Sequence, residues 1–308
     1  MPVTLSDIAR ALRGEVAGRH VLAPGPNHST KDRSLSITLS ASSPDGYVVF
    51  SHAGDDWRTC RDYVANALGL PSDRWRETRQ PDPAEIARRR EAQRRAEEQH
   101  QAETRRKQRQ AVAMWDRAGD PRQTVVEIYL RSRGLVLPDE IAGDVLRFHP
   151  NCPWGEGATA PAMIAPFRCA RTGVILGVHR TALTPDGRKV GRKMFGTALG
   201  CAIMLDPEDA ITAGLAIGEG IESCLSARQL GISPVWALGS TSSIAAFPVL
   251  AGIQSLTLLE ERDGGASSRA CTECGTRWHR AGRAVDVVLP KVGKDLNDQI
   301  MEGATAWH

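Results

Sequence analysis

The sequence predicts an α/β protein whose C-terminal third is built around a parallel sheet. After residue 208, four short apolar runs alternate with helix-like segments of about a dozen residues, which is typical of βαβ units with helices on both faces of a sheet. Acidic residues follow three of these runs. A long charged stretch with few large apolar residues separates this region from a small N-terminal unit.

Length and composition set broad limits. The chain has 308 residues, of which 41% are hydrophobic, so it can bury a real core and form two domains, or one domain with an appendage. No stretch approaches the roughly 20 apolar residues of a membrane span, and the N-terminus lacks the apolar centre of a signal peptide. The seven cysteines show no disulfide framework, so we expect reduced thiols and a cytoplasmic location. A net charge of +3 does not by itself require a nucleic-acid partner.

Residues 1–70 are expected to form a small α+β unit. A helix is predicted from Leu5 to Leu12, followed by strands in "RSLSITLS" and "GYVVFSH" and a second helix in "WRTCRDYVANALGL". Residues 71–118 are predicted to be a charged helical linker. Its alternating Arg and Glu fit a solvated helix with i,i+4 ion pairs, or a basic arm that contacts nucleic-acid phosphates.

Residues 119–208 are expected to form a second α+β unit, ahead of the parallel sheet in 209–308. "TVVEIYLRSRGL" predicts an amphipathic helix with Val126, Tyr129 and Leu130 on its apolar face. Strands are predicted in "PAMIAPFRC" and "VILGVHRTAL". The glycine-rich and basic segment "TPDGRKVGRKMFG" is predicted to be a turn.

Carboxylates should gather at one edge of the parallel sheet, because functional groups collect beyond the carboxyl ends of parallel strands. The acids at these strand ends are Glu219, Glu222, Glu260, Glu261, Asp263, Asp295 and Asp298. Crowded carboxylates resist ionisation, and Mg²⁺ or Mn²⁺ relieves that conflict. Two such ions can clamp the oxygens of a phosphoryl transfer. The alternative is that these acids are solvated or paired with nearby arginines.

Three segments carry a resemblance to a known domain: "LAIGEGIESCLSA", "LTLLEERDGGASSRA" and "GRAVDVVLPKVGKDLND" resemble the Toprim domain of bacterial-type primases, topoisomerases and some nucleases. Glu219 matches the glutamate of that family, and Glu261 and Asp263 match its Asp-x-Asp pair, with Glu261 in place of the usual first aspartate. Asp295 and Asp298 fall where primase-like members carry another acidic pair. The resemblance implies a Rossmann-like fold, with Glu219, Glu261 and Asp263 as catalytic residues. It also implies that these three residues and Asp295 are Mg²⁺ ligands.

The resemblance to primases extends upstream. "EIYLRSRGL" and "APFRCARTGVILGVHRTAL" resemble the primase polymerase core, and "GRKMFG" resembles the basic stretch just ahead of the Toprim domain. This implies that Arg133, Arg180, Arg192 and Lys193 contact nucleotide or DNA. The alternative for each is a solvated surface charge.

The N-terminal unit resembles the zinc-binding domain of bacterial primases, in "GPNHSTKDRSLSI" and "YVVFSHAGDDWRTCRDYV". Its four ligand positions correspond to Gly25, His28, Val49 and His52. Because a structural zinc takes four ligands, we expect the shape of this domain without zinc. His28 and His52 would then be a retained polar pair or a remnant of a template contact. The thiols of "CTEC" (271–274) more typically pack inside a helix.

Taken together, the resemblance implies a primase-type nucleotidyltransferase. It would use Mg²⁺ or Mn²⁺ and ribonucleoside triphosphates to make short primers on single-stranded DNA, in a plasmid or phage, with a separate replicative helicase as a further candidate partner. The alternatives are a non-catalytic single-stranded-DNA-binding accessory protein or a Toprim nuclease. The sequence contains no G-x-x-x-x-G-K-[ST] loop, so we do not expect a fused P-loop ATPase.

Overall fold

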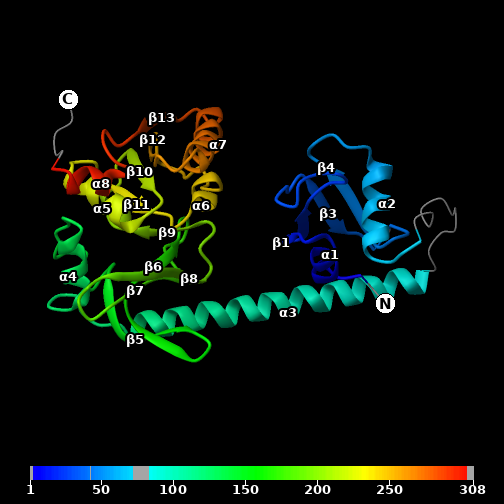
Figure 1. The fold of residues 1–308 in the computed structure, drawn as a ribbon, viewed down its shortest axis with the longest axis horizontal. Coiled ribbons are helices and arrows are strands. Elements are labelled where there is room, and N and C mark those ends of the chain that lie inside the picture. Colours follow the sequence, from blue (N-terminus) through cyan, green and yellow to red (C-terminus); the bar gives the residue numbers. More distant parts are fainter. Residues whose placement is uncertain (1–2, 42, 72–82, 304–308) are drawn as a thin grey trace. The chain divides into compact units, whose positions relative to one another are not determined.

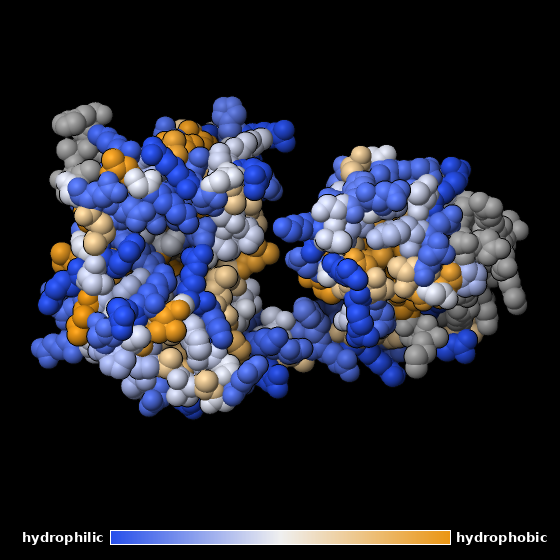
Figure 2. Space-filling view, in the orientation of Figure 1, coloured by the Kyte–Doolittle hydropathy of each residue, from blue (hydrophilic) through white to orange (hydrophobic). Residues whose placement is uncertain are grey.

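The computed structural model describes residues 3–41, 43–71 and 83–303. These residues form two compact units, which divide between Gln101 and Ala102 (Figure 1). Within the described residues, no helix is both long and apolar enough to cross a membrane. Figure 2 shows hydrophilic side chains over most of the visible face of the C-terminal unit, with apolar side chains in small patches among them.

The N-terminal unit is an antiparallel sheet covered by two helices. The sheet has the order β1 (Glu15–Ala17), β2 (His20–Ala23), β3 (Leu35–Leu39) and β4 (Tyr47–Ser51). Helices α1 (Leu5–Leu12) and α2 (Trp57–Ala67) pack in one cluster with the buried side chains of β2, β3 and β4. The structure confirms both predicted helices and both predicted strands. The sequence did not predict β1 and β2, because strands of three and four residues are too short to show a period of two.

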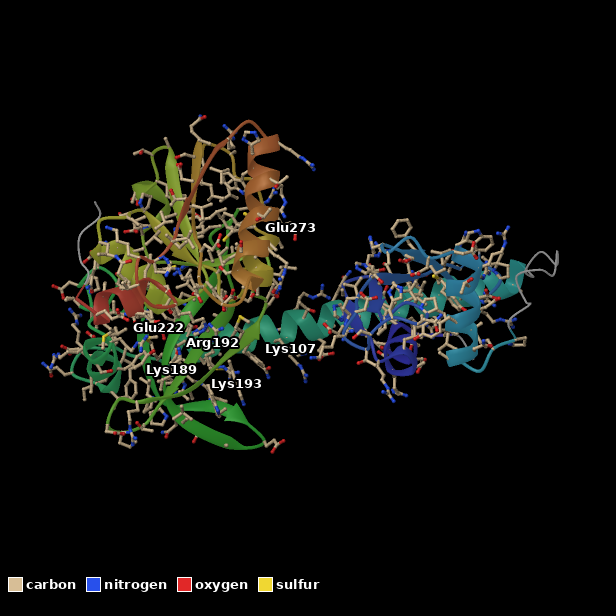
Figure 3. The ribbon with its side chains drawn as sticks, turned by 45° about the horizontal axis from the view of Figure 1, so that its top comes forward. Lys107, Lys189, Arg192, Lys193, Glu222 and Glu273 are labelled. Carbon is tan, nitrogen blue, oxygen red and sulfur yellow. The ribbon has the colours of Figure 1, made fainter. Side chains whose placement is uncertain are left out.

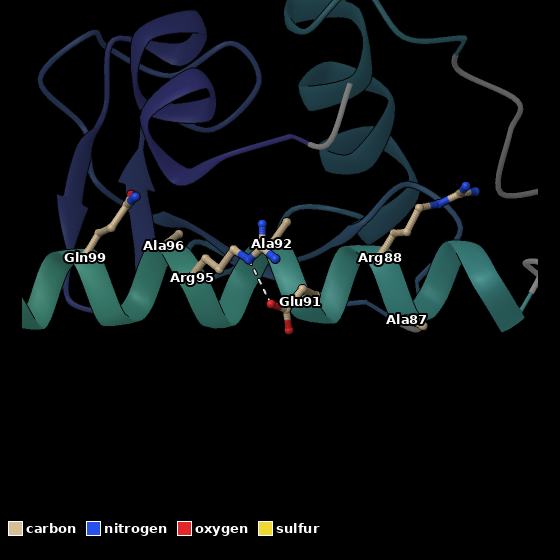
Figure 4. A pocket seen from close by; sticks show the side chains of 7 residues that line it. All are labelled: Ala87, Arg88, Glu91, Ala92, Arg95, Ala96 and Gln99. Atoms are coloured by element: carbon tan, nitrogen blue, oxygen red, sulfur yellow. Dashed lines mark hydrogen bonds and ion pairs between the residues drawn. The ribbon is translucent and has the colours of Figure 1, made fainter.

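The charged stretch forms one continuous helix, α3 (Pro83–Asp116), of 34 residues. Intrahelical ion pairs stabilise it as predicted: Arg95 contacts Glu91 at 2.8 Å, and Lys107 contacts Glu103 at 2.7 Å. Figure 4 shows the first of these pairs on a shallow hollow of the helix among small alanine side chains. All the residues that line this hollow belong to α3 itself.

The helix α3 is more than a solvated linker, because each end contacts a different unit. In the N-terminal unit, the Arg89 guanidinium donates to the carbonyl oxygen of Ser43 at 3.1 Å. In the C-terminal unit, Ala111, Met114 and Trp115 are buried in a cluster with strands β5 to β7.

The C-terminal unit contains one nine-stranded sheet, with the order β13-β12-β10-β11-β9-β6-β7-β8 and β5 paired to β6. The strands are β5 (Arg147–Gly155), β6 (Ala158–Cys169), β7 (Ile175–Leu183), β8 (Lys189–Gly196), β9 (Cys201–Met204), β10 (Gly214–Gly218), β11 (Val235–Ala237), β12 (Ser255–Leu259) and β13 (Ala284–Val288). Strands β10 to β13 are parallel, which confirms the predicted four-stranded parallel sheet. The pairing of β9 with β11 carries this sheet across the domain boundary predicted at residue 208.

The basic segment before the Toprim-like region is a strand, so the predicted turn is wrong for residues 189–196. Strand β8 pairs with β7 along its length, with Lys193 opposite Arg180 and Arg192 opposite Thr181. As the edge strand it is exposed on both faces, and its sequence therefore lacks the alternation that marks a half-buried strand. Its basic side chains are consequently held on a regular strand.

Helices cover both faces of the parallel sheet, as predicted. Helices α4 (Val125–Ser132), α5 (Ile221–Gln229) and α8 (Leu296–Met301) pack in one cluster, and α6 (Thr241–Ala245) and α7 (Ala266–Arg280) in another. On β10, Ala216 belongs to the first cluster, while Leu215 and Ile217 belong to the second. The second cluster contains Trp278, which is 0% exposed and stacks on Phe247 with ring centroids 6.1 Å apart.

Replacing Trp278 by alanine should lower the free energy of unfolding of this unit by about 3–5 kcal/mol, because a large cavity is left in the second cluster. The matched control is Leu199→Ala, which truncates a side chain that is 62% exposed and should change stability by about 0.5 kcal/mol or less. Urea denaturation followed by far-ultraviolet circular dichroism measures both. Equal effects of the two substitutions would contradict the assigned core.

Candidate active site

The predicted acids meet in one cleft at the carboxyl edge of the parallel strands. The register of β10, β12 and β13 is matched, with Gly214 opposite Ser255 and Ser255 opposite Ala284, so these strands end side by side. The cleft has a volume of about 720 Å³ and is lined by the acids Glu219, Glu222, Glu261, Asp263 and Asp295. Its basic residues are Arg133, Arg188, Lys189, Arg192 and Lys294. All four predicted metal ligands and two of the four predicted basic residues therefore line the same cleft.

Glu219 follows β10 directly and depends on the glycine before it. A Cβ atom on Gly218 would lie 2.8 Å from the Cys224 sulfur and 3.3 Å from Leu259 Cβ, so only glycine lets β10, α5 and β12 approach this closely. The Glu219 carboxylate accepts a hydrogen bond from Arg192 at 2.7 Å. Glu219 is thus held at the cleft by a cation from β8.

The acidic pair after β12 has two different environments. Burial raises the pKa of Glu261, and the nearby charges of Glu219 and Asp295 raise it further. In contrast, Asp263 accepts the backbone N–H of Ser267 at 3.0 Å, and this hydrogen bond at the start of α7 lowers the pKa of Asp263. One acid of the pair resists ionisation and the other is readily ionised.

The turn between this pair and α7 needs two glycines. Gly264 and Gly265 have φ angles of 80° and 98°, a region that side-chain-bearing residues rarely adopt. Helix α7 can therefore begin at Ala266, close enough for Asp263 to accept the amide of Ser267 in its first turn.

Helix α8 supplies the fourth predicted ligand. Asp295 is the residue that caps α8, and its carboxylate accepts from the amides of Asn297 at 2.8 Å and Asp298 at 2.9 Å. The buried Asn297 side chain donates to the carbonyl oxygen of Arg133 at 2.8 Å. This contact fixes the end of α4, so that Arg133 faces the cleft.

Glu222 is a cleft residue that the sequence placed at a strand end but did not assign to the site. Its carboxylate accepts hydrogen bonds from the Tyr129 hydroxyl and from Lys189 Nζ, the latter at 2.8 Å. Burial alone raises the pKa of Glu222, but the Lys189 ammonium and the two hydrogen bonds outweigh it and lower the pKa to about 2. Figure 3 shows Glu222 with Lys189 and Arg192, where β8 faces α5. Its position three residues after Glu219, in the first turn of α5, was the available signal.

Arg180 and Lys193 do not line the cleft. Arg180 is 7% exposed, donates to the carbonyl oxygen of Pro153, and lies over the rings of Trp154 and Phe195. Lys193 is exposed and donates to the carbonyl oxygen of Trp154 at 2.6 Å. Adjacent residues of a strand point to opposite faces, so Arg192 enters the cleft while Lys193 points away from it. The structure thus gives Arg180 a buried role that differs from the predicted contact with nucleotide or DNA.

The cleft carboxylates are the kind of oxygen ligand that a hard divalent cation prefers, but their side chains are not grouped to hold an ion. In residues 3–41, 43–71 and 83–303, no three His, Cys, Asp or Glu side chains are grouped so that they could hold an ion. Two contacts explain this: Arg192 holds Glu219, and the Ser267 amide of α7 holds Asp263. The raised pKa of Glu261 still marks a place where added positive charge would be favourable.

At the positions that correspond to the ligands of the zinc-binding domain, the structure places a hydrogen-bonded cluster around His28. His28 contacts Asp32 at 2.8 Å through Nδ1 and Asp55 at 3.2 Å through Nε2. A Cβ atom on Gly25 would lie 3.0 Å from Asp55, so the cluster fills the space beside this position. His52 instead packs edge-on against Phe50, at 4.8 Å between ring centroids. Among the described residues, no hydrogen bond joins the two histidines, and each has its own contacts.

Comparison with protein families identifies two regions. Residues 214–306 match the Toprim domain, and residues 105–205 match a domain of unknown function (DUF7146). The C-terminal region of this chain is therefore a Toprim domain, as predicted. No curated protein sequence matches the chain.

Among solved structures, the chain is similar to several primases. It is 14% identical to the zinc-binding and RNA polymerase domains of the Aquifex aeolicus primase, with 97% of this chain and 83% of that chain covered and a TM-score of 0.42. It is 13% identical to a DnaG primase catalytic domain bound to single-stranded DNA, with coverages of 66% and 77% and a TM-score of 0.47. For the E. coli primase catalytic core the identity is 14%, the coverages are 65% and 75%, and the TM-score is 0.43.

The His28 cluster should be visible in a pH titration. The hydrogen bond to Asp32 is the main cause that raises the pKa of His28 above 6.5, so protonated His28 stabilises the folded N-terminal unit. This stabilisation is present below pH 6.5 and is lost as the pH rises through the higher folded-state value. Nuclear magnetic resonance of the imidazole should give a midpoint above 6.5 that falls in Asp32→Asn and is unchanged in Asp139→Asn, an exposed site in the other unit. A wild-type midpoint at or below 6.5 would be inconsistent with the cluster.

Proposed function

We propose that this protein is a primase-type nucleotidyltransferase that joins ribonucleoside triphosphates into short primers on single-stranded DNA. The observation that carries the proposal is the cleft of the Toprim domain, where carboxylates from three strand ends face cations from β8, α4 and the loop before α8. A phosphoryl-transfer site needs this combination of metal-binding acids and phosphate-binding cations. The order of the primase-like sequence segments supports the same conclusion.

Glu219, Glu261, Asp263 and Asp295 would hold Mg²⁺ or Mn²⁺ in this proposal. When bound, such an ion neutralises phosphate charge and helps the pyrophosphate group to leave. Burial and the acidic neighbours Glu219 and Asp295 raise the pKa of Glu261, so a bound cation would favour its ionised form. Glu219 has two candidate roles, as a ligand or as the acceptor of the proton from the attacking hydroxyl group.

The cleft cations would position the triphosphate. Lys189 is fixed by Glu222, which in turn accepts from the Tyr129 hydroxyl, so the ammonium group is pre-oriented and needs little reorganisation. Arg192 now neutralises Glu219 and would exchange this partner for a phosphate when an ion binds Glu219. Arg133, Arg188 and Lys294 complete the basic lining. Phosphoryl transfer is mostly positioning and charge neutralisation, which this arrangement provides.

The template would follow the face of β8 that points away from the cleft and carries Lys193. Lys193 lies 4.9 Å from the centre of the Trp154 ring, and a cation beside an aromatic ring suits the backbone and bases of a single strand. Arg180 would act indirectly, by fixing the strand that carries Trp154. The setting in a plasmid or phage and a separate helicase partner also belong to this proposal, and they rest on the sequence resemblance alone.

A second candidate function is single-stranded DNA binding without catalysis. The ion pair between Arg192 and Glu219 favours it, because it occupies the carboxylate that catalysis needs. The replacement of the family's first aspartate by Glu261 favours it as well. Both candidates predict DNA binding, and only the first predicts primer synthesis.

Primer synthesis on a single-stranded template with labelled ribonucleotides and Mg²⁺ or Mn²⁺ tests the proposal. Wild-type protein should make short oligonucleotides. Asp263→Asn and Glu219→Gln should each reduce the rate by about 100-fold or more, because each removes a carboxylate that would hold the cation whose positive charge neutralises the transition state. The matched control is Glu273→Gln, which changes an exposed glutamate on α7 labelled in Figure 3 and should leave the rate unchanged.

Two results would overturn parts of this account. If wild-type protein binds DNA but makes no product, the non-catalytic alternative is correct. If product formation survives Asp263→Asn, the enzyme assignment stands and the assignment of its site is wrong.

A further inference from the structure

Two cysteines face each other where the two parts of the large sheet join. Strands β6 and β9 pair at two positions, Arg168 opposite Ala202 and Cys169 opposite Cys201. In the strand order, this pairing connects β5 to β8 with β9 to β13. The two thiols therefore lie at the strand pairing through which β8 is joined to the parallel strands.

The backbone geometry is suitable for a disulfide. The N–H of Cys169 donates to Val174 at 2.8 Å, and the N–H of Cys201 donates to Ala198 at 3.0 Å, so the two cysteines do not exchange backbone hydrogen bonds. In an antiparallel sheet, a directly opposite pair that does not exchange backbone hydrogen bonds has Cα atoms about 4.5 Å apart and side chains close together. Disulfides require a Cα separation of about 4.4–6.8 Å. Both side chains also pack against the same core cluster, which places them on the same side of the sheet.

We propose that Cys169 and Cys201 form an oxidative modification site, at which a peroxide converts the two free thiols into an intrachain disulfide. The inference rests on strand register and does not depend on primer synthesis. All seven cysteines lie within the described residues, and all are free thiols in the structure.

The two thiols differ in exposure and in pKa, and these differences indicate which of them reacts first with peroxide. Of the seven cysteines, Cys169 is the one that is not buried, while Cys201 is 1% exposed. The hydrogen bond with the Thr172 side chain lowers the pKa of Cys169, which favours the reactive thiolate. Burial, with a smaller contribution from Cys169, raises the pKa of Cys201 to about 11. Cys169 is therefore the thiol that reacts with peroxide, and Cys201 is the thiol that resolves the product.

The chemistry balances with hydrogen peroxide as oxidant. The Cys169 thiolate attacks one peroxide oxygen: an S–O bond forms, the O–O bond breaks, and hydroxide leaves to take up a proton as water. The Cys201 sulfur then attacks the sulfenic acid: the S–S bond forms, the S–O bond breaks, and a second water leaves with the thiol proton. Two thiols and one peroxide thus give one disulfide and two waters.

The other five cysteines are all buried, which makes them poorly placed for the same reaction. Cys271 and Cys274 are both buried within one helix, and burial raises the pKa of Cys271 to about 11 and that of Cys274 to about 12. Cys60 is buried in the N-terminal unit, where burial also raises its pKa. Oxidation should therefore be selective for the pair at the strand junction.

The test oxidises the reduced full-length protein with hydrogen peroxide, digests it without reductant, and analyses the peptides by mass spectrometry. We expect a linked pair of peptides containing Cys169 and Cys201, with a loss of about 2 Da that dithiothreitol reverses. Cys169→Ser and Cys201→Ala should abolish the link, and the matched control Cys60→Ala should retain it. Because Cys169 is partly exposed, Cys169→Ser keeps the test usable if Cys201→Ala does not fold.

Thermal unfolding gives a second readout. The disulfide would close a loop that contains β7 and β8, so the oxidised wild-type protein should unfold several degrees higher than the reduced protein. Peroxide should produce no such rise in Cys169→Ser. The proposal is overturned if Cys169 is converted to sulfinic acid without the linked peptides, or if peroxide links other cysteines instead.

Discussion

The structure depends on the crowding of like charges at one edge of a parallel sheet. The register of β10, β12 and β13 ends these strands together, and each end delivers a carboxylate or leads to one. Repulsion between such groups opposes folding unless they are protonated, hydrogen-bonded or paired. Two of these solutions occur in this cleft: Asp263 accepts the Ser267 amide of α7, and Glu219 pairs with Arg192. Glu261 keeps a raised pKa, because it is buried and lies near Glu219 and Asp295.

The cations that balance this edge come from a different part of the sheet. Strand β8 lies at the opposite end of the strand order from β13, yet Lys189 and Arg192 reach Glu222 and Glu219. The continuity of the sheet through β9 and β6 makes this possible, because it joins the antiparallel strands to the parallel ones. The Toprim domain and the region before it therefore build one site together. A substitution at the strand junction could alter the cleft without touching it.

The sequence predicted the parallel sheet and its acids well, because alternating apolar runs and strand-end carboxylates are local signals. It missed features that depend on partners distant in sequence. Strand β8 lacks a buried face, so its glycine-rich and basic sequence shows no apolar alternation and resembles a turn. The role of Glu222 depends on Tyr129 and Lys189, which lie 93 and 33 residues away in the chain. Arg180 matched a family motif, but its burial against Trp154 could only be seen in three dimensions.

The central claim is that the crowded carboxylates form a divalent-cation site, and calorimetric titration with Mn²⁺ tests it most directly. Wild-type protein should bind Mn²⁺, and Glu261→Gln should weaken binding by about 10-fold to 100-fold, because a ligand and a negative charge are removed. Binding should also weaken as the pH falls, and earlier than for an ordinary carboxylate, because protons compete for Glu261, whose pKa is raised. Glu273→Gln on the exposed face of α7 should bind like the wild type. Equal affinities of wild type and Glu261→Gln, or no binding by either, would contradict the account.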